Sequence, residues 1–236
     1  MLGINKLQIE FIPASKEAED LVPYPRPAKL YIPDWYKSIK PLSEPDFFDG
    51  GAISNQGLKE CVPFLDALTH GYIQESWTDI YIKNDNGMVS YYYQTGPEII
   101  SSREHPSVPF FQNLFYNLEF VWKEQWIPKL PKGYSVLYTS PLNNLSLPFK
   151  CLDAIIDADY YHHEYNGQYP FYMYKNFTGL IPAGTPLYQI IPIKRENWKS
   201  VANQYNEKEN KIKNNQIRKY YFKSYKKQFW QKKGFE

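Results

Sequence analysis

The middle of the chain alternates hydrophobic and polar positions with a period of two, which is typical of β-strands. Residues 77–83 follow this pattern, a turn-forming run stands at 84–87, and a tyrosine-rich run continues over 88–94. An Asn-Gly step between two alternating runs is a strong hairpin signal. The pattern therefore predicts a β-hairpin over residues 77–94.

Other short runs are rich in β-branched and aromatic residues and are separated by turns that contain Gly or Pro. These runs are 118–123, 134–139, 154–160, 170–175 and 187–193. Many short strands joined by close turns favour a sandwich or a jelly-roll-like barrel. We therefore predict a mainly β domain over residues 51–195.

Two stretches have helical spacing instead. Phe64, Leu68 and Tyr72 lie four residues apart, which predicts a short helix or a buried turn within 61–75. Residues 203–230 contain neither Gly nor Pro and place apolar side chains four and seven residues apart. They predict an amphipathic helix with a basic face. We assign this helix to a C-terminal segment that spans 196–236.

The first fifty residues carry seven prolines, each of which removes a backbone donor and biases the preceding residue away from helix. Residues 1–50 are therefore predicted to form an extended Pro-rich arm. Asp34 stands near the start of a possible short helix, with Trp35 as its anchor. Two interpretations are open. The arm is a strap packed on its own domain, which we favour, or a peptide that reaches into another subunit.

The composition is typical of a folded protein, because 43% of the residues are hydrophobic and only 22% are charged. No run of 18 apolar residues occurs, so we expect no membrane span and no membrane partner. The first ten residues lack a signal-peptide pattern, and two cysteines do not make a disulfide framework. We expect a reduced intracellular protein whose lone cysteines are core residues rather than nucleophiles.

The net charge of +2 hides an asymmetry. Residues 207–236 hold ten basic and three acidic residues, a local charge of +7, so the rest of the chain carries −5. A basic tail on an acidic body favours an anionic partner or docking on a neighbouring subunit. The side chains expected to contact a partner are Trp35, Tyr221, Tyr225, Phe229, Trp230, Lys223, Lys226 and Lys227.

These tail residues allow two interpretations. Aromatic rings interleaved with lysines are how proteins hold single-stranded nucleic acid, through base stacking and phosphate contacts. The same pattern also suits a helix whose aromatic face docks on protein while its lysines remain solvated. We favour docking.

Four motifs between residues 131 and 191 give the chain a resemblance to a known family. Pro131-Lys-Gly-Tyr is followed by a serine loop at Ser140, by Ala154-Ile-Ile-Asp-Ala-Asp-Tyr160, and by a turn and strand that contain Gln189. In order and spacing this resembles the core of trimeric dUTPases and dCTP deaminases. The resemblance implies a distorted jelly roll (β-clip) and a homotrimer.

If the chain were an enzyme of that kind, the resemblance would imply roles for four residues. Asp157 would activate the attacking water, Tyr160 would pack on the sugar, and Ser140 and Gln189 would complete the site, with Mg²⁺ as cofactor. The phosphate-binding arginines and glycines of the family are missing, however, and Pro186 stands where an arginine is expected. A triphosphate needs several cationic or backbone N–H contacts as well as Mg²⁺. These departures argue against pyrophosphate release.

Two more stretches, 32–37 and 59–67, resemble a family of uncharacterised proteins that is found in tailed bacteriophages. We therefore expect a non-catalytic phage protein, a structural or binding module located in the virion or the host cytoplasm, with other phage proteins as possible partners. The alternative is a divergent nucleotide hydrolase or a nucleotide-binding sponge that uses the hairpin of Asp157 and Tyr160.

A metal site is the weakest candidate. His162 and Glu164 would share one face of a strand, but two ligands on one face are not enough and a third must come from elsewhere. We expect an exposed polar hairpin tip there, and no cofactor unless the enzyme alternative holds.

Overall fold

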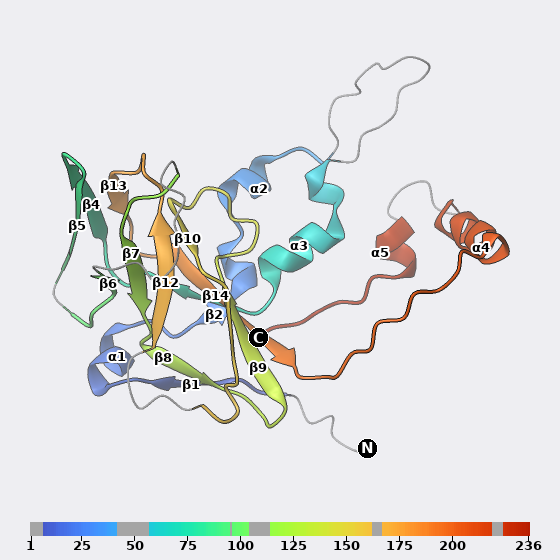
Figure 1. Cartoon of the computed structure of the whole chain (residues 1–236), viewed down its shortest axis with the longest axis horizontal. Helices are drawn as coiled ribbons and strands as arrows, with labels where there is room; N and C mark the ends of the chain where they lie inside the picture. The colour runs from blue at the N-terminus through green and yellow to red at the C-terminus, as the bar shows by residue number, and fades with distance from the viewer. Residues whose placement is uncertain (1–6, 42–56, 95, 104–113, 162–166, 219–223) are drawn as a thin grey trace, which may run out of the picture.

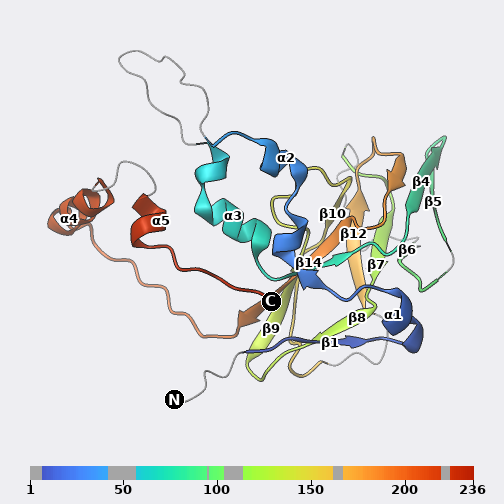
Figure 2. The same cartoon turned by 180° about the vertical axis from the view of Figure 1, so that it is seen from behind.

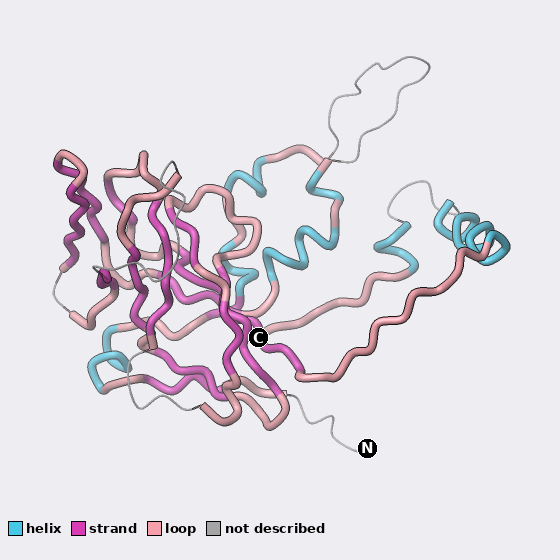
Figure 3. Tube along the Cα trace, in the orientation of Figure 1, coloured by secondary structure: helices cyan, strands magenta, loops and turns pink. Residues whose placement is uncertain are grey.

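A computed structural model describes residues 7–41, 57–94, 96–103, 114–161, 167–218 and 224–236. Strand dominates over helix in this part of the chain (Figure 3), so the prediction of a mainly β protein is confirmed. The helices are α1 (Lys16–Leu21), α2 (Asp34–Ser38), α3 (Val62–Thr69), α4 (Glu207–Arg218) and α5 (Ser224–Gln228), with short 3-10 helices at Ala28–Tyr31 and Leu58–Glu60.

The strands of the described residues form four antiparallel sheets, seen together in Figure 1. The five-stranded sheet has the order β11 (Ala154–Ile156), β9 (Tyr134–Thr139), β14 (Pro186–Lys194), β3 (Tyr72–Glu75) and β2 (Arg26–Pro27). The four-stranded sheet has the order β10 (Phe149–Cys151), β12 (Gln168–Met173), β7 (Glu119–Lys123) and β6 (Ile100–Arg103). The smaller sheets are β13 (Gly179–Ile181), β4 (Ile80–Asp85) and β5 (Met88–Tyr93), and the pair β1 (Glu10–Pro13) and β8 (Trp126–Lys129).

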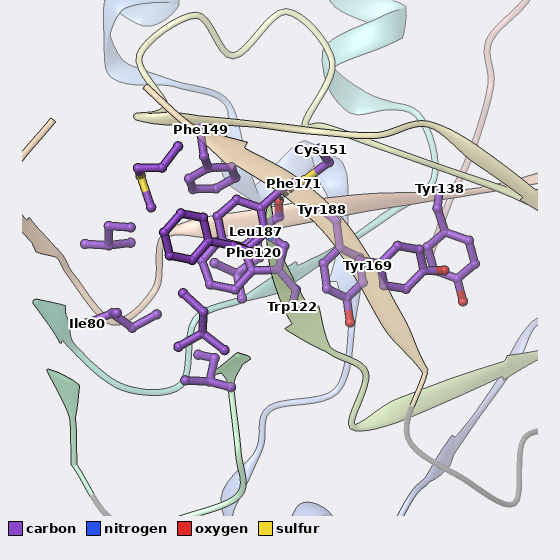
Figure 4. Close-up of a cluster of buried hydrophobic side chains, with 14 of the residues drawn as sticks. Ile80, Phe120, Trp122, Tyr138, Phe149, Cys151, Tyr169, Phe171, Leu187 and Tyr188 are labelled. Carbon is purple, nitrogen blue, oxygen red and sulfur yellow. Dashed lines mark hydrogen bonds between the residues drawn. The ribbon is translucent and has the colours of Figure 1, made fainter. Parts of the chain in front are cut away.

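One hydrophobic core joins the three larger sheets. Trp122 of β7 is fully buried and stacks on Phe171 of β12, with ring centroids 4.0 Å apart. Tyr188 of β14 and Ile80 of β4 belong to the same buried cluster. Figure 4 shows these side chains meeting in the space that the sheets enclose. The aromatic residues that favoured strands in the sequence therefore also fill the core, where each ring buries a large apolar area.

The predicted hairpin is confirmed as β4 and β5. Asn86 and Gly87 both have positive φ, 52° and 92°, and the side chain of Asn84 accepts a hydrogen bond from the Gly87 N–H at 2.8 Å. Two central residues with positive φ match the right-handed twist of the strands they connect. The first strand begins at Ile80 rather than at residue 77.

The N-terminal arm is packed on its own domain, which confirms the favoured interpretation for its described part. β1 pairs with β8, and β2 pairs with β3 at the edge of the five-stranded sheet. The arm also contains the unpredicted helix α1, which begins where the Ser15 side chain accepts a hydrogen bond from the Ala18 N–H. Asp34 starts α2 as predicted, and Trp35 packs edge-on against Phe64 of α3.

Two predicted elements are shorter in the structure. The strand at 154–160 ends at Ile156, because Asp157 and the residues after it turn back, with the Tyr160 N–H bonded to the Asp157 carbonyl. The single helix at 203–230 is wrong in extent, since α4 begins only after Asn206, whose side chain accepts a hydrogen bond from the Glu209 N–H. Residues 196–206 are not helical.

Candidate functional site

The hairpin residue Asp157 lies beside a second carboxylate and an arginine at one end of β9. Arg195, which directly follows β14, donates to Asp157 at 3.1 Å and to Asp159 at 2.8 Å, and its second terminal nitrogen also pairs with Asp159. Ser135 donates its hydroxyl to Asp157 at 2.6 Å. The Arg195 guanidinium stands 5.7 Å from the ring of Tyr160. The cluster is therefore an ion-pair network in which Asp159 is buried and Asp157 lies at the exposed edge.

This network does not suit a Mg²⁺ ion. Mg²⁺ is held by carboxylate oxygens in octahedral geometry. Here a guanidinium already engages both carboxylates, Asp157 and Asp159. Arg195 thus neutralises part of the negative charge that would attract a Mg²⁺ ion to these two carboxylates.

The Arg195 hydrogen bonds lower the pKa of Asp159 to about 2, with a further contribution from the Gly133 N–H, which donates at 2.7 Å. We predict that Arg195→Gln moves the pKa of Asp159 back toward its ordinary 3.8. Because the folded-state pKa is depressed, this contact stabilises the protein above about pH 4 and is lost as the pH falls toward 2. Titration of the Asp159 carboxyl carbon by NMR measures the shift; equal pKa values in both proteins would contradict it.

Ser140 and Gln189 lie together but serve the backbone. The Ser140 hydroxyl accepts a hydrogen bond from the Cys151 N–H at 2.8 Å. The Gln189 side chain accepts one from the Leu142 N–H at 2.7 Å and donates to the carbonyls of Ala67 and His70. Both side chains are buried. Gln189 thus fastens the end of α3 and the loop after β9 to β14.

The four residues of the enzyme alternative do not share one site within a chain. Asp157 lies opposite Ser135 near the start of β9, whereas Ser140 follows the last residue of that strand. Five residues of strand separate these positions by about 17 Å. Asp157 and Tyr160 are brought together, and Ser140 and Gln189 are brought together, but the two pairs are apart.

We predict that Ser140→Ala lowers the free energy of unfolding by about 1–2 kcal/mol, because it leaves the buried Cys151 N–H without its acceptor. Thermal or urea unfolding measures the change. The control is Ser146→Ala, because the hydroxyl of the exposed Ser146 bonds only the Asn144 side chain, at 2.8 Å, in the described structure. An equal loss in both variants would contradict a structural role for Ser140.

A buried acidic group that the sequence did not single out lies in the core. Glu124, between β7 and β8, is 1% exposed and accepts a hydrogen bond from the Tyr138 hydroxyl at 2.5 Å. Burial raises the pKa of Glu124 to about 7. The rings of Tyr138, Tyr169 and Tyr188 stand side by side (Figure 4), and Tyr138 is the one bonded to Glu124. Burial also raises the pKa values of all three tyrosines. No local sequence pattern identifies Glu124 and these tyrosines as a group, because the tyrosines come from other strands.

Neither cysteine forms part of a reactive arrangement in the described structure. Cys61 and Cys151 are both free thiols, and burial raises the pKa of Cys151 to about 12, which keeps it protonated. His162 and Glu164 lie outside the described residues. Among the residues that are described, no group of three His, Cys, Asp or Glu side chains could hold a metal ion.

The C-terminal segment leaves the body after β14, carries α4 and α5, and returns to α3 (Figure 1, and from behind Figure 2). The return is anchored by Asp66 of α3, which accepts hydrogen bonds from the Trp230 indole at 2.9 Å and from Lys233 at 2.7 Å. Phe235 then packs edge-on against His70, with centroids 4.6 Å apart. Trp230 therefore contacts its own chain.

We call residues 196–229 the projecting arm. It exposes large apolar side chains along its described length. They are Trp198, Val201, Tyr205, Ile212, Ile217, Tyr225 and Phe229. Lys226 and Lys227 of α5 are exposed as well, whereas Tyr221 and Lys223 lie outside the described residues. In α4, Lys211 and Lys213 pair with Glu207 and Glu209, which offsets part of the basic charge.

A groove lies at the start of β14, at the opposite end of this strand from Arg195. It has a volume of about 1100 Å³ and lies between the N-terminal residues 30–37, the loop before β10 and the segment 176–186 that contains β13. Its walls carry Tyr31, Trp35, Leu145, Leu147, Phe177 and Leu180. We call it the strap groove.

No protein-family model matches the chain, and no curated protein matches it in sequence. No helix in the described part of the chain has the length and apolar character needed to cross a membrane.

Proposed function

We propose that the protein is a non-catalytic bacteriophage module, structural or binding in role and associated with the virion, that assembles through its projecting arm. The scaffold we propose is a dUTPase-like distorted jelly roll, and the assembly a homotrimer. The single observation that carries the proposal is the row of exposed apolar side chains on the arm. An exposed apolar surface of this kind marks a protein interaction site.

The chemistry of the hairpin supports a structural role. Asp157 is bonded by Arg195 and Ser135, and Ser140 and Gln189 are bonded to the backbone. Both contacts of Asp157 fall on its Oδ1 and join the carboxylate to a guanidinium of the same chain, so this residue serves as an ion-pair partner even though its side chain is 62% exposed. A nucleotide hydrolase or a nucleotide sponge that uses Asp157 and Tyr160 therefore finds less support than an assembly role.

The arrangement of the arm supports assembly as well. Both of its ends are fixed to the body, one through the Arg195 N–H bonded to the Gly133 carbonyl and the other through Asp66. The described parts of the segment between these anchors, 196–218 and 224–229, project away from the sheets (Figure 1). An arm tethered at both ends presents its side chains in a defined place, which lowers the entropy lost when a partner binds.

The experiment is a mass measurement by size exclusion with light scattering on the full-length protein. We expect about three times the mass of one 27.9 kDa chain. The triple variant Trp198→Ser, Tyr205→Ser, Phe229→Ser is expected to elute as a single folded chain. A wild-type protein that stays monomeric at all concentrations would overturn the proposed assembly.

Two further measurements separate the alternatives. Mass spectrometry of purified phage particles is expected to detect the protein, and its absence there would remove the virion role.

A thermal shift with deoxynucleotides, with and without Mg²⁺, is expected to show no stabilisation. Clear stabilisation by one nucleotide that disappears in Asp157→Asn would favour the nucleotide alternative.

A further inference from the structure

β5 is an edge strand that carries none of the features by which proteins usually protect an edge. Its six residues, Met88–Tyr93, include no proline and no charged side chain, and they pair with β4 in one unbroken register. Both views place β5 at the outer end of the molecule (Figure 1 and Figure 2). The free backbone groups of such a strand pair readily with another strand, so natural proteins usually shorten the edge or place charges or proline on it.

The other edge strands of the described structure are protected in these ways. β10, β11 and β13 have three residues each, and β2 has two. β6 has four residues and ends on Arg103, while β1 and β8 contain Pro13 and Pro128. The contrast identifies β5 as the edge that is open to a partner strand.

The hairpin turn determines which backbone groups of β5 face away from β4. In a two-residue hairpin the residues that flank the turn, here Asp85 and Met88, exchange hydrogen bonds, and every second pair after them does the same. The alternate residues Val89, Tyr91 and Tyr93 therefore direct their N–H and C=O groups outward. Among the described strands, β4 is the only neighbour of β5.

These three residues are complementary to a second copy of themselves. When two β5 strands meet antiparallel around a two-fold axis at Tyr91, Val89 of each copy faces Tyr93 of the other. Tyr91 then faces Tyr91, and all three residues find a backbone partner. Any other antiparallel register leaves Val89 or Tyr93 opposite a residue outside the strand. On the outer face the same register sets Ser90 beside Tyr92.

The side chains favour this register as well. An aromatic ring beside a β-branched side chain and a ring beside a ring are both favourable cross-strand pairs, whereas like charges in those places would be unfavourable. Val89, Tyr91 and Tyr93 are only partly buried against their own core, so a second copy would cover surface that they still expose. A strand from another protein would have to reproduce this pattern, whereas a second copy supplies it by symmetry.

We propose that the β5 edge binds the β5 edge of a second copy in an antiparallel, two-fold symmetric pairing centred on Tyr91. The sheet of β13, β4 and β5 then continues across the axis into the second copy. The contact goes beyond the proposed function, because it uses neither the projecting arm nor the strap groove, and it can join one trimer to another. One strand edge per copy is a small contact, so we expect it to form at high protein concentration and not at the dilution of size exclusion.

Disulfide trapping between two differently tagged full-length chains tests the register. Both chains carry Cys61→Ser, which removes the exposed native thiol. One carries Ser90→Cys and the other Tyr92→Cys, at positions that face each other across the proposed axis. The matched control replaces Tyr92→Cys with Met88→Cys, which is also exposed and on the same face but lies four residues away along the strand.

The two combinations are expected to differ strongly in yield. Four strand steps place the control position about 13 Å from the one that faces residue 90, whereas a disulfide needs Cα atoms within about 7 Å of each other. After mixing at high concentration and mild oxidation, we therefore expect at least about tenfold more cross-linked heterodimer with Tyr92→Cys than with Met88→Cys. Equal yields, or no heterodimer with either variant, would overturn the pairing.

The backbone contact is tested by adding Val89→Pro to the Tyr92→Cys chain. Proline removes an N–H that faces away from β4, so the hairpin keeps its own hydrogen bonds. Because the pairing with the second copy loses a hydrogen bond, we expect the cross-link yield to fall at least about fivefold. Val89→Ile keeps the N–H and is expected to leave the yield unchanged; an equal fall in both variants would contradict pairing through the backbone.

The arm variant Trp198→Ser, Tyr205→Ser, Phe229→Ser separates this contact from the proposed assembly. We expect it to lose the trimer mass and to keep the cross-link between residues 90 and 92. A wild-type protein that is trimeric in dilute solution but gives no such cross-link would overturn the β5 pairing alone. A wild-type protein that is monomeric in dilute solution and still gives the cross-link would overturn the arm assembly alone.

Discussion

Replacing Glu124 with glutamine is expected to remove a loss of stability that the wild-type protein shows as the pH rises from about 4.5 to about 7. In the folded chain the pKa of Glu124 is about 7, because the carboxyl group is buried, whereas its ordinary value is 4.5. The unfolded chain therefore gives up this proton at a lower pH than the folded chain does. Stability that is fully present below pH 4.5 is lost as the pH rises through 7.

The expected size of this effect is roughly 3 kcal/mol, since each pKa unit corresponds to about 1.4 kcal/mol. The measurement is the free energy of unfolding in urea at several pH values between 4 and 8.5. Glutamine has no proton to lose, so the slope in this window should flatten, even if the amide packs less well against Gly167. The relevant observable is the slope and not the absolute stability at one pH.

Tyr138→Phe provides the matched control for Glu124. The Tyr138 hydroxyl donates to the Glu124 carboxylate and opposes the rise in its pKa that burial causes. Removing that hydroxyl should shift the loss of stability to higher pH, in contrast to the flattening expected from Glu124→Gln. An unchanged slope in Glu124→Gln would mean that other groups cause the pH dependence.

The parts of the fold that could be predicted from the sequence are those whose signals are local. The hairpin of β4 and β5 was predicted because alternation and an Asn-Gly turn stand next to each other in the chain. β1 and β8 were missed because they are four residues long and contain Pro13 and Pro128, which a strand at the edge of a sheet tolerates. α1 was missed because the prolines around it favoured an extended arm.

The candidate site was harder to predict because its decisive contacts join distant residues. Asp157 and Tyr160 were found through a motif, but Arg195 lies 38 residues after Asp157 and reaches it only because β9 pairs with both β11 and β14. No spacing rule in a single sequence identifies such a partner. The same reason explains why Glu124 and Tyr138 escaped notice as a pair.

The buried polar residues share one physical role, which is to fix how the sheets and helices meet. Gln189 holds the end of α3 on β14, and Ser140 holds the loop after β9 on β10. Polar groups inside a protein cost stability unless each finds its partner, and once paired they specify one arrangement. Residues that resemble a nucleotide site thus contribute to a rigid body from which the projecting arm extends.

Gly71→Ala is expected to lower the free energy of unfolding by about 3–5 kcal/mol. Gly71 connects α3 to β3 with a φ of 70°, a region that alanine adopts at a cost of about 1–2 kcal/mol. A methyl group at this position would also overlap the backbone carbonyl oxygen of Ile190 in β14. Because that carbonyl belongs to the fully buried Ile190 in the central strand β14, it cannot move aside without disturbing the pairing of β14 with β9 and β3.

Gly184→Ala separates these two causes. Gly184 has a similar φ of 83°, but a methyl group there meets no atom within 4 Å. We expect this variant to lose only the conformational cost of about 1–2 kcal/mol. Unfolding in urea measures both variants under the same conditions. A loss in Gly71→Ala no larger than that in Gly184→Ala would show that β14 yields at Ile190, and the close approach of α3 to the sheet would then not be what makes glycine necessary at this junction.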